Sequence, residues 1–282
     1  MMISMTPWKG CVLTSLVLVA CASARPAAGQ ESNLYWGDTH LHTSYSVDAY
    51  RWGNVSAGPE TAYRFARGLP VTHPTLLNRV RLDRALDFLV IADHSGPGLD
   101  IEDRVGVNPY KFGLQAGTDS HTSLSTPDED NFWGKTVLDS SPEGGATQTP
   151  SPFGGNWDVV GWDYAAQGLT GAWASENTRE ALTAAFKRKE VYATSGPRIR
   201  LRMFGGFEFD ADDTNARDIA TVGYGGGVPM GGDLGQAPNG SPVSLLIHAV
   251  KDPVGANLDR VQVIKGWLDE AGDTNERVHD VE

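Results

Sequence analysis

Cysteine is almost absent from this sequence, because its only two cysteines, Cys11 and Cys21, lie in the leader. The rest of the chain can therefore form no disulfide, no thiolate nucleophile and no zinc–thiolate site. Hydrophobic residues make up 40% of the 282 residues. A fold without disulfides has to be stabilised by the core that these residues can build.

Positive charge is also scarce. Lys and Arg number 23 against 35 Asp and Glu, which gives a net charge of −12 and a pI near 5.0. This balance argues against a nucleic acid or an anionic membrane as a partner held by bulk charge. It leaves room for a small anionic substrate, since a bound metal ion can reverse the local field.

The apolar run of the leader is too short to span a bilayer as a mature helix. Residues 11–20 form an apolar run of about ten residues after Lys9, as in an export signal. The following Leu18-Val19-Ala20-Cys21 resembles a bacterial lipobox, in which Cys21 becomes the lipidated first residue. Ordinary cleavage after Ala24 or near Gly29 is the alternative. We expect residues 1–30 to be signal and tether, and the protein to be exported, either periplasmic or a lipoprotein anchored only through its lipid.

Two histidines follow the first apolar run of the mature chain. His40 and His42 come shortly after Leu34-Tyr35-Trp36. Residues i and i+2 of a strand point to the same face, so both imidazoles can reach one metal ion. Asp48, six residues beyond His42, can return a carboxylate to that point.

Two more apolar runs end in the same residue types. Residues 88–92 read as a buried strand that ends in Asp93-His94, and residues 112–121 read as another strand-like run, which ends in Asp119-Ser120-His121. Three such runs predict one metal site at the carboxyl ends of parallel strands in an α/β fold.

The remaining pattern predicts the other elements and the domain boundaries. Helices are expected at 59–67, at 78–86 and at 175–190, the last with Ser175 or Asn177 as its cap. Strands are expected at 191–194, 199–203, 243–250 and 260–264, with a further one near Val278, whereas 210–242 shows no helical period. Arg198, Arg200 and Arg202 alternate with apolar residues, as on the wet face of a sheet. We divide the chain into an α/β domain at 31–205 and a glycine-rich, β-rich region at 206–282.

Several motifs together resemble the bacterial family catalogued as domain of unknown function 3604. That family is similar to the PHP (polymerase and histidinol phosphatase) superfamily of metal-dependent phosphoesterases. The motifs are Gly37-Asp38-Thr39-His40-Leu41-His42-Thr43-Ser44-Tyr45-Ser46, Ala92-Asp93-His94, Asn108-Pro109-Tyr110-Lys111-Phe112-Gly113, Gly117-Thr118-Asp119-Ser120-His121-Thr122 and Glu190-Val191-Tyr192-Ala193-Thr194-Ser195-Gly196-Pro197-Arg198-Ile199. The resemblance implies a distorted β/α barrel that carries one to three metal ions.

The resemblance also implies roles for individual residues. The metal ligands would be His40, His42, Asp48, His94, Asp119 and His121. Asp93 and Asp119 are the expected catalytic carboxylates. Separately from the resemblance, Lys135 and Arg198 are the expected contacts to an anionic substrate such as a phosphate ester. Ligands of this type suit Zn, Mn or Fe.

The chain departs from that family between two of the motifs. Only residues 95–118 separate His94 from Asp119, and they contain no histidine, whereas the family carries middle strands and further ligands there. We therefore expect the barrel to be incomplete. The sequence predicts an exported metal-dependent hydrolase, with a non-catalytic, metal-binding, lipid-anchored remnant or interaction protein as the alternative.

Overall fold

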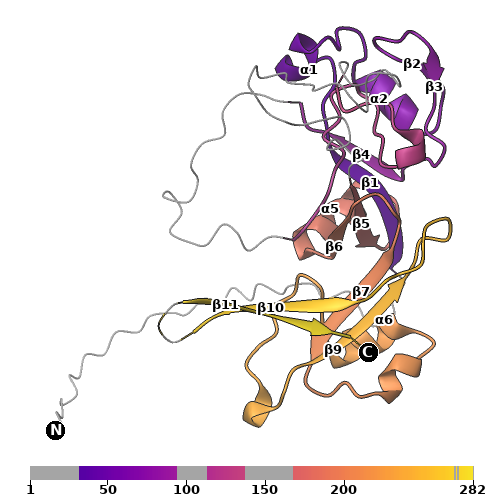
Figure 1. The fold of residues 1–282 in the computed structure, drawn as a ribbon. Coiled ribbons are helices and arrows are strands. Elements are labelled where there is room, and N and C mark those ends of the chain that lie inside the picture. The colour runs from indigo at the N-terminus through magenta and orange to yellow at the C-terminus, as the bar shows by residue number, and fades with distance from the viewer. Residues whose placement is uncertain (1–31, 94–112, 137–167, 270, 272, 282) are drawn as a thin grey trace, which may run out of the picture.

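The computed structural model describes residues 32–93, 113–136, 168–269, 271 and 273–281. Figure 1 shows a mixed α/β part at the top of the molecule and a β-rich part below it. This agrees with the predicted α/β class. No helix among the described residues is long and apolar enough to cross a membrane.

The α/β part is built on one mixed sheet. Its central strand β1 (Asn33–Leu41) pairs in parallel with β4 (Phe88–Ile91) and antiparallel with β5 (Leu169–Ala174), which pairs antiparallel with β6 (Val191–Thr194). Only one strand pair is therefore parallel. The described residues form an open four-stranded sheet in the order β4-β1-β5-β6 and no closed barrel.

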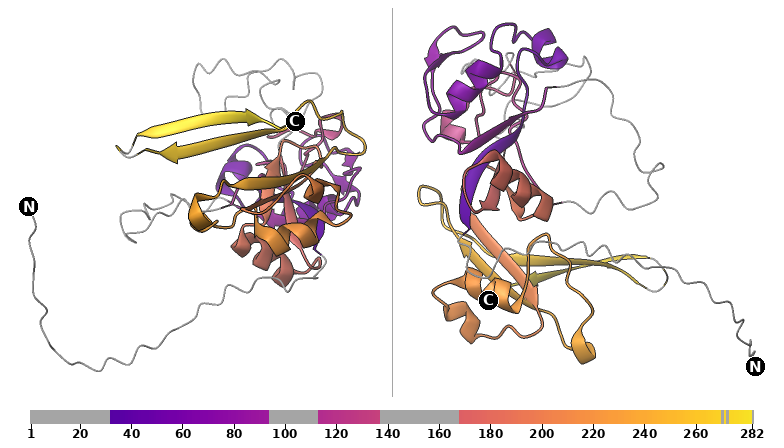
Figure 2. Two further views of the ribbon diagram at one scale, coloured as in Figure 1. Left: turned by 90° about the horizontal axis from the view of Figure 1, so that it is seen from below. Right: turned by 180° about the vertical axis from the view of Figure 1, so that it is seen from behind.

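Side chains cover both faces of this sheet. On β5, Leu169 and Trp173 belong to a core cluster with Phe65 of α2 (Pro59–Ala66), whereas Ala172 and Ala174 pack with Leu182 of α5 (Arg179–Arg188). The alternation of β5 thus places one helix against each face. Views from two further directions show α5 and α2 in separate parts of the α/β unit (Figure 2).

The first and third predicted helices are confirmed, with one different cap. Helix α2 ends before Gly68, which has a φ of +71°. Helix α5 begins after Thr178, whose hydroxyl accepts a hydrogen bond from the Ala181 amide at 3.3 Å, so neither Ser175 nor Asn177 is its cap. The described residues of this part also form a short α1 (Val47–Arg51) and a 3₁₀ turn η1 (Glu129–Asn131).

The helix predicted at 78–86 is wrong. Residues 79–80 form β3 (Arg79–Val80), which pairs with β2 (Val71–Thr72). Val80 and Leu82 are buried and the residues on either side of each are exposed. This period of two is that of an extended chain, and burial of both side chains in the core decides the conformation.

The β-rich part contains a helix that the sequence did not predict. Its three-stranded sheet has the order β8-β7-β9, from β7 (Arg200–Gly206), β8 (Gly227–Pro229) and β9 (Ser244–Val250). Helix α6 (Ile219–Gly226) lies between β7 and β8 in the sequence, and the Asp218 side chain caps it. A Cβ on Gly223 would lie 2.3 Å from the ring of Phe204. Close packing on β7 therefore requires this glycine, and tertiary contact overrides weak helix propensity.

The last strands form a separate hairpin. Strands β10 (Gln262–Leu268) and β11 (Thr274–Asp280) pair antiparallel, and Figure 1 shows them projecting to one side. The predicted strands at 243–250, at 260–264 and near Val278 are thus confirmed, the second running on to Leu268. The 3₁₀ turn η3 (Asp212–Asn215) lies between β7 and α6, and the 3₁₀ turn η4 (Pro238–Gly240) lies between β8 and β9.

The arginine stripe of β7 is not simply its wet face. Arg202 is buried, and its guanidinium carbon lies 3.6 Å from the centre of the Trp173 ring. A guanidinium over an indole is a favourable cation–π contact. Arg202 therefore packs the β-rich sheet against β5.

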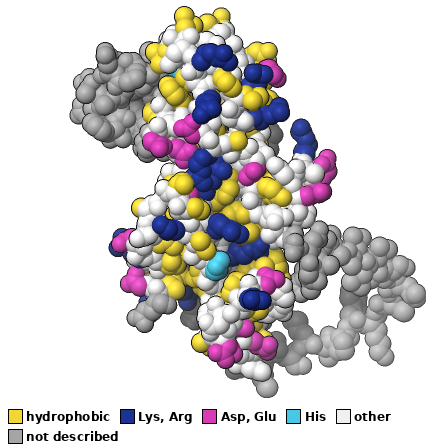
Figure 3. All heavy atoms as spheres, turned by 90° about the vertical axis from the view of Figure 1, so that its right-hand side faces the viewer, with side chains coloured by type: hydrophobic (Ala, Val, Ile, Leu, Met, Phe, Trp, Pro, Cys, Tyr) yellow, Lys and Arg dark blue, Asp and Glu magenta, His cyan; other side chains and the backbone are white. Residues whose placement is uncertain are grey.

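An ion pair also connects the two parts. Asp252, which follows β9, accepts a hydrogen bond from Arg84 at 2.8 Å and one from the Arg198 amide at 2.7 Å. Its side chain is only 3% exposed. Figure 3 shows Lys and Arg side chains gathered around the middle of one face, with acidic side chains nearby.

We expect Asp252→Asn to destabilise the protein in a pH-dependent way. Burial opposes the charge, but the hydrogen bonds from Arg84 and Arg198 lower the pKa of Asp252 to about 2. The folded-state pKa lies below the unfolded value of about 3.9. This contribution is therefore present above pH 4 and is lost as the pH falls toward 2. Urea unfolding should show a loss of about 1.5–3 kcal/mol at pH 7 that shrinks below pH 4.

Asp83→Asn is the matched control for that measurement. Asp83 lies 3.8 Å from Arg81 in an ion pair whose side chains are both more than two thirds exposed. Such a pair contributes about 0–1 kcal/mol. An equal loss in both variants, or a loss in Asp252→Asn that does not change with pH, would contradict the expectation.

Candidate metal centre

The centre lies where β1 ends and residues 117–121 run alongside it. The Asp119 amide donates to the His40 carbonyl at 2.7 Å, and the His42 amide donates to the Ser120 carbonyl at 2.9 Å. These two bonds bring the predicted His-x-His and Asp-x-His motifs side by side. Gly117 allows this approach, because a Cβ there would lie 2.5 Å from the His40 amide nitrogen.

Of the strand-like run predicted at 112–121, the described residues 113–121 form only an isolated parallel bridge, between Ser120 and Leu41. The segment is nevertheless fixed beside the sheet by side chains. The Thr170 hydroxyl on β5 accepts a hydrogen bond from the Ala116 amide at 3.0 Å and donates one to the Ala116 carbonyl at 2.7 Å. The Thr39 hydroxyl donates to the same carbonyl. Backbone groups that bond to hydroxyls cannot also form a strand ladder.

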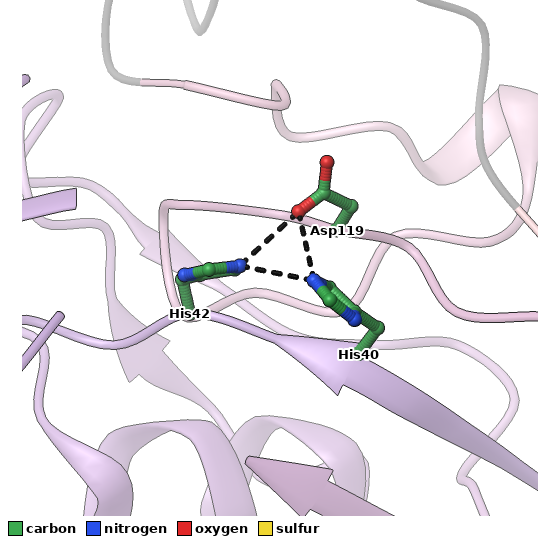
Figure 4. A group of neighbouring side chains, drawn as sticks. All are labelled: His40, His42 and Asp119. Atoms are coloured by element: carbon green, nitrogen blue, oxygen red, sulfur yellow. Dashed lines mark hydrogen bonds and ion pairs between the residues drawn. The ribbon is translucent and has the colours of Figure 1, made fainter. Parts of the chain in front are cut away.

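Three side chains form what we call the outer group: His40, His42 and Asp119 (Figure 4). The Nε2 atoms of His40 and His42 lie 3.1 Å apart. Asp119 Oδ1 lies 3.4 Å from His40 Nε2 and 3.2 Å from His42 Nε2. A tetrahedral ion with ligands at about 2.0–2.1 Å separates those ligands by roughly 3.3–3.4 Å. The triangle of donor atoms therefore fits one ion.

A second set, the inner group, consists of His42, Asp48 and His121. Asp48 Oδ1 lies 3.4 Å from His42 Nδ1, and Asp48 Oδ2 lies 3.4 Å from His121 Nε2. The rings of His42 and His121 are stacked with their centres 4.1 Å apart. Asp48 is on α1, so the loop after His42 returns a carboxylate as the sequence predicted. His42 belongs to both groups.

Neighbouring residues orient these ligands. The His121 Nδ1 lies 2.8 Å from the carbonyl of Asp119, which leaves Nε2 directed at Asp48. The Ser46 hydroxyl lies 2.8 Å from His42 Nδ1 and donates to Asp48. Bonds of this kind fix the ring orientation and the tautomer of a histidine ligand.

The charges also favour a cation. Burial opposes the charges of Asp48 and Asp119, but hydrogen bonds from Ser46 to the former and from His42 and Lys135 to the latter hold both pKa values well below the usual range. Burial and the neighbouring His42 lower the pKa of His121. Burial also disfavours charge on His42, yet the bond to Asp119 and the nearby carboxylates raise its pKa. At neutral pH the carboxylates are ionised and His121 is neutral, as metal binding requires, whereas a metal ion at His42 has to displace the proton that its raised pKa favours.

The other predicted site residues lie in different places. Lys135 is in the centre, with Nζ 2.9 Å from Asp119 Oδ2. Asp93 accepts hydrogen bonds from the amide and the hydroxyl of Thr43. It belongs to neither the outer nor the inner group. Arg198 donates to the carbonyls of Arg84 and Ala85. His94 and Cys21 are outside the described residues.

Sequence reasoning missed the side chains that support the ligands. Asp38, Ser46 and Asn54 are all completely buried, and each bonds to a ligand residue or to its backbone. The signal for Asp38 was a charged residue in the middle of a predicted strand, where residues 36–39 are all buried. Asn54 had no such signal, since an isolated asparagine in a loop is ordinary.

The centre and the mixed sheet define an α/β protein with a histidine- and carboxylate-rich cluster. The chain belongs to the family described as "Protein of unknown function (DUF3604)", which it matches over residues 29–98 and 96–282. No curated protein and no solved structure matches it.

Proposed function

We propose that this protein is a metal-dependent hydrolase, most plausibly of phosphate esters. The observation that carries the proposal is the pair of adjoining ligand groups that share His42. Bound divalent ions would supply a metal-activated water and a positive field for substrate oxygens. Nitrogen and oxygen donors without sulfur favour Zn, Mn or Fe. The resemblance of the His/Asp motifs to those of PHP phosphoesterases supports the same reaction class.

In this proposal the residues have separate roles in metal binding and substrate binding. His40, His42, Asp48, Asp119 and His121 hold the metal, with His94 as a further ligand predicted from the sequence alone. Lys135 places a cation beside Asp119 and would bind an oxygen of an anionic substrate. Arg198, which bonds to two backbone carbonyls, is the weaker of the two predicted substrate contacts.

One observation favours a second function, that of a non-catalytic metal-binding remnant. The family match falls into two segments that meet at residues 96–98. A break at this position is what a chain shortened between His94 and Asp119 would give. The family's middle ligands would then be missing, and the protein would bind a metal or a partner without turning over a substrate.

Turnover of p-nitrophenyl phosphate distinguishes the two functions. We expect the purified protein to hydrolyse it slowly in the presence of Zn²⁺ or Mn²⁺, and Asp119→Ala to abolish that activity. Activity that persists in Asp119→Ala would come from another site or a contaminant and would contradict the hydrolase. Metal binding without turnover would favour the remnant.

We also propose that the protein is exported and anchored through Cys21. If the lipobox is used, Cys21→Ala should leave an unprocessed, unlipidated precursor, because the other cysteine, Cys11, precedes the cleavage site. Membrane fractionation and intact mass measure both effects. An unchanged mass and unchanged fractionation would indicate ordinary cleavage instead.

A further inference from the structure

Asp38 is a completely buried carboxylate of β1 that belongs to neither ligand group. Its Oδ1 accepts hydrogen bonds from the His40 amide at 2.9 Å and from the Thr118 amide at 3.0 Å. Its Oδ2 accepts one from the Thr118 hydroxyl. One side chain thus binds both segments of the outer group, β1 with His40 and the 117–121 segment with Asp119.

The bond from the His40 amide falls where β1 is irregular. The pairing register of β1 with β4 shifts between Asp38 and Leu41. An irregularity of this kind leaves a ladder amide without its strand partner and changes the direction of nearby side chains. The Asp38 carboxylate supplies that partner. It therefore stabilises the local backbone from which His40 points at Asp119.

The inner group has a different buried support. Asn54 is completely buried and donates to the His121 carbonyl at 3.1 Å and to the Ser123 hydroxyl at 2.9 Å. Its side-chain oxygen accepts from the Ala57 amide at 3.1 Å. The ring of Trp52 lies 4.5 Å from that of His121. None of these contacts involves Asp38.

We propose that Asp38 is the positioning residue of the outer group and Asn54 that of the inner group, so that each group can be disrupted separately. The inference rests on the proposed function only in requiring that the groups bind metal. Loss of a side chain that orients metal ligands typically lowers metal affinity about 10–100-fold. We expect a loss of that size in one group for each substitution.

Cobalt titration followed by visible absorption tests the proposal, because the spectrum of bound Co²⁺ reports its ligand geometry as well as its affinity. His40→Ala and His121→Ala provide reference spectra for loss of the outer and the inner group. The spectrum of Asp38→Ala should resemble that of His40→Ala, and the spectrum of Asn54→Ala that of His121→Ala. The reverse assignment, or an identical change in both variants, would overturn the proposal.

Two further variants separate positioning from general stability. Asp87 Oδ2 accepts the Trp36 amide at 2.7 Å, which is the same kind of bond at the other end of β1. Asp87→Ala should leave the Co²⁺ spectrum unchanged. Asp38→Asn keeps an oxygen acceptor and should restore affinity to within about threefold of wild type. Equal losses in Asp38→Ala and Asp87→Ala would overturn the positioning role.

If Asp38→Ala does not fold, Thr118→Val carries the test. It removes only the hydroxyl that donates to Asp38, and it should weaken the outer group selectively. Unchanged Co²⁺ affinity and spectrum in this variant would overturn the inference. A wild-type protein that binds no Co²⁺ would overturn the proposed function itself, whereas normal wild-type binding with no selective effect would overturn the inference alone.

Discussion

His42→Ala should lose essentially all bound divalent metal. His42 contributes a nitrogen to the outer group and lies 3.4 Å from Asp48 in the inner group, so its removal takes one ligand from each. Two ligands remain in each group, too few for a stable site. We expect affinity to fall by more than the roughly 10–100-fold that follows loss of an orienting neighbour. Elemental analysis after dialysis, with competition titration, measures it.

Single-group variants give the comparison for that result. His40→Ala removes a ligand only from the outer group, and His121→Ala only from the inner group. Each should lower metal occupancy sharply but less than His42→Ala. His248 is exposed on β9, outside both groups, so His248→Ala is the matched control and should retain its metal. Equal metal content in wild type, His40→Ala and His121→Ala would exclude the centre.

The grouping of these His and Asp side chains could be predicted from sequence because their signals are local. His40 and His42 are one residue apart on a strand, and Asp48 follows in the next turn of chain. Asp119 and His121 end a second segment, and backbone pairing to β1 brings them to the same point. The prediction needed only that two segments end at one edge of a sheet, which many α/β arrangements satisfy.

The surrounding fold depends on contacts that the local sequence does not contain. The His/Asp motifs predicted parallel strands, yet β5 and β6 are antiparallel to their neighbours in the sheet. Helix α6 exists because Gly223 packs against Phe204, and Arg202 is buried because Trp173 lies beneath it. Each outcome is decided by a residue distant in sequence. The described residues form no closed barrel, the architecture that the family resemblance implies.

The way in which the two groups are joined bears on catalysis. Two-metal hydrolysis needs ions about 3.5–4 Å apart, so that the attacking and leaving oxygens are both stabilised. A bridging carboxylate achieves this, because its two oxygens lie side by side. Here the shared residue is His42, whose Nε2 faces the outer group and whose Nδ1 faces Asp48. The two ring nitrogens point in divergent directions, and Nδ1 already bonds to the Ser46 hydroxyl, so His42 is a poor bridge between two ions at the separation that this clamp requires.

We therefore expect slow phosphomonoester turnover by this chain and a large gain when the missing segment is restored. The resemblance to PHP proteins implies further ligands between the motifs that residues 95–118 connect here. Replacing 95–118 with the corresponding segment of a full-length family member should raise metal-dependent turnover by about 10²–10³-fold, the usual effect of a missing charge-stabilising group. Steady-state hydrolysis of p-nitrophenyl phosphate by both proteins, at equal metal occupancy, measures the difference.

The graft needs a control for its own ligands and for stability. A second graft in which its histidines and carboxylates are replaced by alanine and asparagine should restore the chain length without the activity. A gain that survives this replacement would come from better folding, and thermal unfolding of both grafts would show it. Fast turnover by the short chain, lost in Asp119→Ala, would mean that a histidine-linked pair of sites is sufficient. The divergence of the two His42 nitrogens would then be no obstacle to catalysis.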